Sequence, residues 1–252
     1  MAKMTLLEMV QDILSDMVSD EVNSIDDTVE SQSVANIIKT TYYSMLANRN
    51  WPHTRKLVQL ESSGSIDRPN YVRLPSTLKE LVSIEYDCKK LGAVNSDFRE
   101  LKYKYPDEFL RMVSSRKSGD ANVKTVTDFS GVKLLILTDK APEYYTSFDD
   151  DYVVFDSYDS AIDTTIVQAK TGCIAYLTPD WVRENEAIPD LPVDAFPALL
   201  SEAKSASFYN IKQMTNEKEE IKSGKQSRWL ARKAWRTHGG VRTEDYGRRG
   251  KR

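Results

Sequence analysis

The sequence predicts an α+β fold: a helical bundle from the N- and C-terminal segments, a β-rich middle insertion, and an extended basic C-terminal tail. Apolar residues recur every three or four positions near both ends of the chain, which indicates helices. Between these ends, short β-branched and aromatic runs alternate with glycine and proline turns, which indicates strands. We assign residues 1–52 and 190–222 to the bundle, 53–189 to the β-rich module, and 223–252 to the tail.

The first two helices are predicted at residues 5–20 and 27–48. The first has a capping box in which Thr5 pairs with Glu8, three positions later. The second must end before Pro52, because proline disfavours the helical conformation of the residue before it. The apolar stripes are Leu6, Met9, Val10, Ile13, Leu14 and Met17 in the first helix, and Val34, Ile37, Ile38, Thr41, Met45 and Leu46 in the second. The short polar connector between them favours an antiparallel pair.

The middle of the chain changes to the period of strands, which predicts a mostly antiparallel β-rich module. Two short helices are expected within it, at residues 98–103 and 106–114. The predicted strands are residues 56–61, 71–74, 81–86, 123–128, 132–137, 152–155 and 173–177.

Three prolines mark the return to helix: Pro189, Pro192 and Pro197. Proline is tolerated in the first turn of a helix, where the N–H groups have no partner within the helix. A long helix is predicted at residues 194–221. The dipeptide Ser-Gly at 223–224 predicts a break, and residues 226–236 are expected to form a further helix.

The charge is divided unevenly along the chain. The net charge of −3 comes from +9 in residues 221–252, with 11 basic and two acidic residues, and −12 in residues 1–220, with 24 basic and 36 acidic residues. A basic terminus on an acidic body indicates an interaction tail. Residues 1–30 have a net charge of −7, which is consistent with a solvated helix face or with an acidic docking surface formed by Glu8, Asp12 and Asp16.

No motif for catalysis, for a cofactor or for a metal was found. The sequence has no phosphate-binding loop, no Gly-x-Ser-x-Gly elbow and no His-Glu-x-x-His pair. Its only histidines are His53 and His238, and its two cysteines are too few for a disulfide framework. We therefore expect no catalytic residue, no cofactor and no metal. No apolar run approaches the roughly 20 residues of a membrane span, and the N-terminus lacks a signal-peptide pattern. We expect a reducing, intracellular site of synthesis.

Two local clusters leave alternatives open. The first is Asp149, Asp150 and Asp151, whose carboxylates could bind Ca²⁺ or form a solvated turn. The ligands of a calcium loop alternate along the chain, whereas these three residues are contiguous, which favours the turn. The second is Trp229 and Trp235 within a Lys/Arg-rich segment. These tryptophans could stack on nucleic-acid bases or anchor a protein interface, and the acidic body favours the interface.

The order of these parts resembles a known family. Two N-terminal helices lead into a β-rich insert, and a long helix and a basic tail follow it. Short motifs accompany this order: NRNWP (48–52), YYTSFDD (144–150), VFDSYD (154–159), IPDLP (188–192) and DYGRR (245–249). The layout resembles, over essentially the whole chain, the head-to-tail adaptor proteins of tailed bacteriophages, of the tail tubular protein A type.

The resemblance implies a structural virion protein and not an enzyme. Such adaptors form a ring, typically of twelve copies, at the head–tail junction, between the portal protein and the tail nozzle or other tail proteins. Double-stranded DNA passes through the ring without sequence-specific binding. The resemblance implies that the C-terminal segment docks on the portal, through Trp229, Arg232, Lys233, Trp235, Arg236, Arg248 and Arg249. The acidic residues Glu8, Asp12, Asp16, Asp149, Asp150 and Asp151 are candidates for a complementary interface.

Three alternatives remain at this point. The chain could bind nucleic acid through its basic tail. It could be a neck or tail-completion protein of a long-tailed phage. It could also be a hydrolytic tail component that uses the carboxylates of Asp149, Asp151 and Asp156, provided that two of them lie about 5–10 Å apart.

Overall fold

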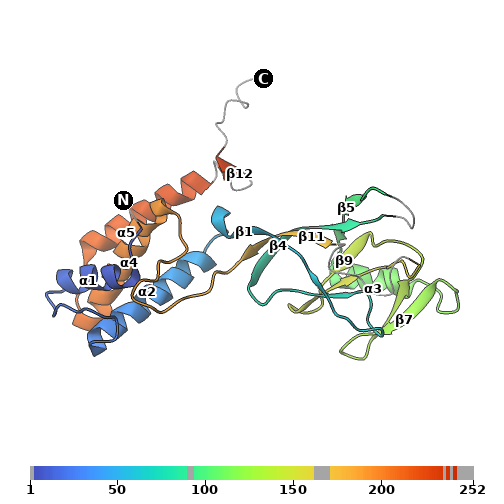
Figure 1. Ribbon diagram of the computed structural model, residues 1–252, viewed down its shortest axis with the longest axis horizontal. Coiled ribbons are helices and arrows are strands. Elements are labelled where there is room, and N and C mark those ends of the chain that lie inside the picture. Colours follow the sequence, from blue (N-terminus) through green and yellow to red (C-terminus); the bar gives the residue numbers. More distant parts are fainter. Residues whose placement is uncertain (1–2, 90–93, 162–170, 235–236, 239–240, 243–252) are drawn as a thin grey trace, which may run out of the picture. The chain divides into compact units, whose positions relative to one another are not determined.

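The computed structural model describes residues 3–89, 94–161, 171–234, 237–238 and 241–242. It has a mixed α+β fold, as predicted (Figure 1). The chain divides into two compact units. The helical unit comprises residues 1–55 and 178–252, and the β unit comprises residues 56–177.

The helical unit is formed by both ends of the chain. Its helices are α1 (Leu6–Asp16), α2 (Val29–Ala47), α4 (Phe196–Lys212) and α5 (Glu217–Ala234), with 3-10 turns at Pro52–Thr54 and Val193–Ala195. Helix α4 packs against α1, α2 and α5, and α1 packs against α2. The short strands β12 (Thr237–His238) and β13 (Val241–Arg242) form an antiparallel pair after α5.

Local signals explain where α1 and α2 begin. The Thr5 side chain accepts a hydrogen bond from the Glu8 backbone N–H, while the Glu8 carboxylate accepts the N–H of Thr5, as the capping-box pattern predicts. Thr28 and Ser31 make the same reciprocal pair at the start of α2. Each such cap contributes about 1 kcal/mol to stability. Helix α1 ends at Asp16, earlier than predicted, because Val18 takes a left-handed conformation with φ of 55°.

The apolar stripes of the helices meet in one core, in which α1 uses the predicted residues. In α2 the predicted Val34, Ile38, Thr41 and Leu46 are buried, whereas Ile37 lies outside the core and Ala35 and Tyr42 join it. The buried members are Leu6, Met9, Val10, Ile13 and Leu14 of α1, Val34, Ala35, Ile38, Tyr42 and Leu46 of α2, Phe196, Ala198, Leu199 and Ala203 of α4, and Leu230 of α5. Among the described residues, helix α5 contributes least to this core.

The β unit is built from several small sheets. One sheet has the strand order β1 (Arg55–Val58), β11 (Thr171–Leu177), β4 (Leu78–Asp87), β5 (Phe98–Glu100). A second has the order β2 (Glu61–Ser62), β3 (Tyr71–Arg73), β10 (Tyr152–Phe155), β9 (Tyr144–Thr146), β6 (Lys102–Tyr103). The third is the ribbon β7 (Val123–Thr127) with β8 (Lys133–Leu137). Strands β6 and β9 are parallel, whereas β4, β5, β7, β8, β10 and β11 pair antiparallel.

Helix α3 (Pro106–Ser114) packs against β8 and β9 in the β unit. Its start agrees with the sequence prediction, and Phe109 and Val113 are its buried side chains. They join a core that is separate from that of the helical unit and that includes Tyr71, Val72, Ile84, Tyr86, Val126, Leu134, Ile136, Val153, Val154, Phe155 and Cys173.

The predicted helix at residues 98–103 is wrong. These residues form β5 and β6, which pair with β4 and β9 in two different sheets. Leu101 between them is 4% exposed and donates its backbone N–H to Ile84. Pairing with distant strands outweighs the local helical pattern of residues 98–103. The sequence of these six residues alone cannot reveal that pairing.

The C-terminal helices are also divided differently from the prediction. The single helix expected at 194–221 ends at Lys212, because Gln213 is left-handed with φ of 54°. Helix α5 then runs through Ser223 and Gly224, where a break was predicted. Ser223 is 3% exposed and its hydroxyl bonds to the Glu202 carboxylate, so packing against α4 stabilises the helix across the glycine.

The limits of the two units differ from the expected domain limits. Residues 178–189, expected in the β-rich module, belong to the helical unit. The limit expected at 222/223 lies inside α5, so the basic segment begins as part of a packed helix.

Candidate docking site

Helix α5 carries the first part of the basic segment. Glu217, Glu219 and Glu220 occupy its first turn, where negative charge is favoured by the helix dipole. The side chain of Asn216 accepts the N–H of Glu219 at 3.3 Å and caps this end. The sequence therefore starts a helix here even though Lys222, three residues beyond Glu219, begins a run of basic residues.

Few side chains attach α5 to the rest of the helical unit. Among its described side chains only Ser223 and Leu230 are buried. Arg49 adds a hydrogen bond of 3.4 Å from its guanidinium to the carbonyl of Ser227. Most of the described side chains of α5 are exposed and can reach a partner.

The open surface of α5 combines cations with large apolar side chains. Ile221 and Trp229 are 57% and 51% exposed. Lys218, Ile221 and Lys225 lie at spacings of three and four residues, so they share one helix face, and they line one hollow. Exposed apolar groups rimmed by charge are typical of interaction surfaces.

The predicted portal-docking residues are described in part. Trp229 lies on α5, and Arg232 and Lys233 continue the same helix. Trp235, Arg236, Arg248 and Arg249 lie outside the described residues.

The acidic residues predicted on the first helix mostly have partners within the chain. The Glu8 carboxylate serves the cap of α1. The Lys204 ammonium lies 2.8 Å from Asp12 and 2.5 Å from Asp16. Burial lowers the pKa of Lys204, but the hydrogen bonds to the two aspartates outweigh it and hold this pKa above its ordinary value. The three residues therefore form an internal α1–α4 contact, which reduces the free charge of the expected acidic surface.

Asp149, Asp150 and Asp151 belong to the β unit, so the six predicted acidic residues fall into two separate groups. The Asp149 carboxylate accepts the backbone N–H groups of Asp151 at 3.1 Å and Tyr152 at 2.8 Å. All three aspartates are exposed, as expected of a solvated turn. Within the described residues no group of three His, Cys, Asp or Glu side chains could hold a metal ion.

Asp156, a candidate of the hydrolytic alternative, is an internal structural group. Its side chain is 2% exposed and lies 3.0 Å from the Arg116 guanidinium. Its other oxygen accepts the backbone N–H groups of Glu143 and Tyr144, each at 3.0 Å. The Ser157 hydroxyl is a fourth donor, at 3.4 Å. A carboxylate that accepts from four donors and is closed off from solvent is poorly placed to transfer a proton to a substrate.

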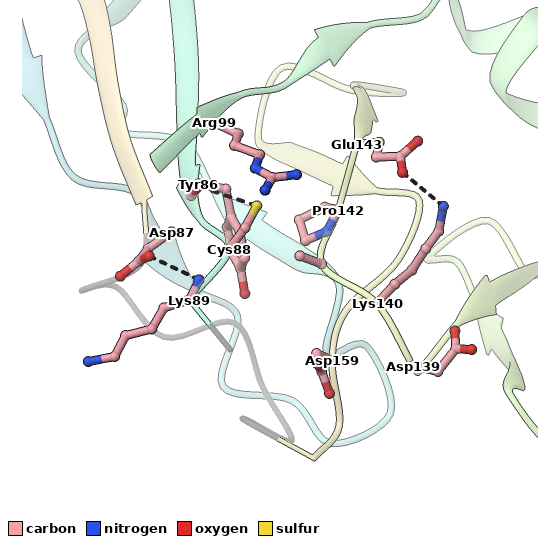
Figure 2. A pocket seen from close by; sticks show the side chains of 11 residues that line it. Tyr86, Asp87, Cys88, Lys89, Arg99, Asp139, Lys140, Pro142, Glu143 and Asp159 are labelled. Atoms are coloured by element: carbon pink, nitrogen blue, oxygen red, sulfur yellow. Dashed lines mark hydrogen bonds and ion pairs between the residues drawn. The ribbon is translucent and has the colours of Figure 1, made fainter. Parts of the chain in front are cut away.

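Figure 2 shows a pocket of about 290 Å³ in the β unit, beside Cys88. The Cys88 thiol donates to the carbonyl of Tyr86 at 3.6 Å, and burial raises the pKa of Cys88. The Arg99 guanidinium, another lining group, is paired with Asp97 at 2.7 Å, and Lys140 is paired with Glu143 at 3.3 Å. A protonated thiol among internally paired charges lacks the activated character of a catalytic nucleophile.

No protein-family model matches this chain, and no curated protein matches it. None of the described helices has the length and apolar character that crossing a membrane requires. The candidate site therefore rests on geometry and charge, and α5 is the element that combines exposure, cations and apolar anchors.

The sequence reasoning missed a second surface, which we call the strap, residues 180–190. The strap lies along α1 and α2 of the helical unit. The Trp181 ring is 5.3 Å from that of Tyr42, Arg183 is 2.7 Å from Asp26, and the Ala187 carbonyl accepts the first N–H of α1, from Leu6, at 2.8 Å. The strap thus satisfies a donor that a helix N-terminus leaves without a partner.

From Glu184 to Ile188 the side chains of the strap alternate between outward and inward positions. Trp181, Asn185 and Ala187 are partly buried, whereas Val182, Arg183, Glu184, Glu186 and Ile188 are exposed. The sequence signal that could have identified the strap is this alternation of V-x-E-x-E-x-I between two prolines, 179 and 189.

Proposed function

We propose that this chain is a head-to-tail adaptor: a structural virion protein whose copies form a ring, typically of twelve, between the portal and the tail. In this proposal the helical unit, a bundle made from both chain ends, forms the wall of the ring. The β unit is an insertion that faces outward or toward the tail. The basic C-terminal segment docks on the portal, and double-stranded DNA passes through the ring.

The observation that carries the proposal is helix α5. It continues without a break from a packed acidic unit into the basic terminus, and its apolar side chains Ile221 and Trp229 are exposed. Outside residues 221–252, the helical unit has 8 basic and 17 acidic residues, a net charge of −9 against the +9 of that segment. Trp and Arg are enriched among the residues that dominate protein interfaces, and residues 228–236 contain two Trp and three Arg.

The test is binding to a purified portal ring from the same phage. Removing all of residues 221–252 would delete Leu230 from the core, so a finer set of variants is needed. A chain ending at Ala234 removes the basic terminus and keeps α5. The triple variant Trp229→Ala, Arg232→Glu, Lys233→Glu reverses the docking charge on α5 itself. Both should keep the helical circular dichroism and lose portal binding by more than about tenfold.

The control is Lys39→Glu with Lys117→Glu, which changes as much charge at exposed positions, one in each unit. This variant should bind the portal normally. If the chain ending at Ala234 and the triple variant both bind the portal as the full chain does, the docking role of the C-terminal segment is wrong.

A nucleic-acid-binding function is the second candidate, favoured by the 11 basic residues of the last 32. It requires affinity for duplex DNA that falls steeply with salt, because bound cations release counterions from the phosphates. Binding of the isolated chain to duplex DNA in about 50 mM salt, abolished by truncation after Ala234, would support it. Absence of binding under these conditions would contradict it.

A further inference from the structure

Four carboxylates of the strap, those of Asp180, Glu184, Glu186 and Asp190, have no cation partner within the described residues. Many acidic groups of this unit are paired within the chain: Asp12 and Asp16 with Lys204, Asp26 with Arg183, Glu30 with Lys212, and Glu219 with Lys222. Within the described residues, the side chains of Glu184 and Glu186 make no ion pair or hydrogen bond. They are exposed, and the chain on either side of them is fixed to α1 and α2.

The two glutamates lie between two exposed apolar side chains. Val182 is 53% exposed and Ile188 is 50% exposed. Apart from Arg183, whose guanidinium is exposed but paired with Asp26, the exposed side chains from Val182 to Ile188 are apolar, acidic, acidic and apolar in turn. Each exposed apolar group by itself is ordinary, but their combination with unpaired charge on a fixed backbone forms a surface that suits a cationic, partly apolar partner.

Helix α5 has the complementary pattern. Lys218 and Lys225 lie about 10 Å apart along the helix axis, on the same face, with Ile221 between them. All three are exposed and line one hollow, and neither lysine has an ion pair within the described residues. This face precedes Trp229 and the rest of the portal-docking segment, so both contacts can be made at once.

We propose that the strap of one copy binds the Lys218–Ile221–Lys225 face of α5 of a second copy of this chain. Glu184 and Glu186 then meet the two lysines, and Ile221 packs beside Val182 or Ile188. The contact joins two different surfaces, so it is heterologous and can be repeated around a closed ring. This inference rests on the adaptor proposal only for the closing of the ring, since the pairing of two copies follows from charge complementarity.

The test is self-association of the full chain, measured by sedimentation velocity at about 100 µM protein in about 50 mM and about 500 mM salt. The native chain should form oligomers at low salt, and high salt should weaken them because exposed charges are screened. The variant Glu184→Lys, Glu186→Lys should weaken association by more than about tenfold, and so should Lys218→Glu, Lys225→Glu. A chain that carries all four reversals should associate again, since the charges are then exchanged.

The matched control is Asp20→Lys with Glu21→Lys, which makes the same charge change at exposed positions of the same unit but away from the strap. This control should associate like the native chain. A native chain that stays monomeric at low salt, or a fourfold reversal that fails to restore association, would overturn the proposed contact. The portal-binding assay is independent of this result: a chain that self-associates through the strap without binding portal would reject the adaptor function and leave the contact standing.

Discussion

The helical unit and the β unit hold charge in different ways. In the helical unit the Lys204 side chain is 10% exposed, but the two aspartates that it pairs with are 38% and 48% exposed. In the β unit the Arg116–Asp156 pair is almost entirely enclosed, with side chains 12% and 2% exposed. Water can solvate the two aspartates if Lys204 is lost, whereas the enclosed Asp156 carboxylate depends on its protein partners. The two ion pairs therefore differ in how much the loss of the cation should cost.

Replacing Arg116 with Met has the largest expected effect. It leaves the Asp156 carboxylate enclosed without its cation, which costs about 3–5 kcal/mol of the free energy of unfolding. The two units can be followed separately: all four tryptophans lie in the helical unit and both cysteines in the β unit. Cys173 is 0% exposed, so labelling of its thiol in urea reports unfolding of the β unit.

The matched variant is Arg111→Met. Arg111 is exposed and 4.0 Å from Asp107, so its loss should cost less than about 0.5 kcal/mol. Should Arg116→Met shift the tryptophan transition and leave Cys173 labelling unchanged, the assignment of this pair to the stability of the β unit is wrong.

Replacing Lys204 with Met is the corresponding change in the helical unit. We expect a loss of about 1 kcal/mol, because solvent screens the half-exposed aspartates. The folded-state pKa of Lys204 is raised, so its contribution is complete below the ordinary lysine pKa and is lost only as pH rises through the folded-state value. Tryptophan fluorescence in urea at pH 7 measures the loss. Lys212→Met, which removes the more exposed pair with Glu30, should cost less, and a loss for Lys204→Met as large as that for Arg116→Met would remove the contrast between the units.

The sequence could predict the features that depend on neighbouring residues, but not those that depend on residues far apart in the chain. The stripes and the Thr5–Glu8 box of the first helix use neighbours within four residues, and the structure confirms them. The Arg116–Asp156 pair joins residues 40 positions apart, and the strands at 98–103 depend on partners in two sheets. The strap was missed, although its V-x-E-x-E-x-I pattern is local, because the contacts that hold it join Trp181 to Tyr42 and Ala187 to Leu6, which are distant in the sequence.

A smaller effect of opposite sign is expected at Val18. This residue is 92% exposed and holds φ at 55°, a conformation that favours glycine and is strained for a β-branched side chain. Val18→Gly should stabilise the helical unit by about 0.5–1 kcal/mol, because it removes this strain at the end of α1. The midpoint of the tryptophan transition in urea measures it. Val29→Gly, at the exposed first position of α2, should destabilise the same unit. Glycine relieves no strain in a right-handed helical conformation and loses more backbone entropy on folding.

The smallest expected effect concerns acid stability of the β unit. Burial raises the pKa of Asp128, but hydrogen bonds from Ser130 and from the Tyr71 hydroxyl, at 2.6 Å, outweigh it and hold this pKa below its ordinary value. A lowered folded-state pKa gives stability that is present above the ordinary aspartate value and is lost as pH falls through the folded-state value. Because Asp128 is partly exposed, the stabilisation is below about 1 kcal/mol.

The variant Asp128→Asn lacks this stabilisation. Above about pH 4, the free energy of unfolding of the native chain should therefore exceed that of the variant by a constant amount. Below that pH the difference should shrink, as Cys173 labelling in urea at a series of pH values would measure. Tyr71→Phe should raise the pKa of Asp128 in a nuclear magnetic resonance titration, because the carboxylate loses a donor. Asp120→Asn, at an exposed position of the same unit, should leave the acid dependence unchanged. A difference between the native chain and Asp128→Asn that persists undiminished down to about pH 2 would show that the contribution of this residue comes from packing and not from its charge.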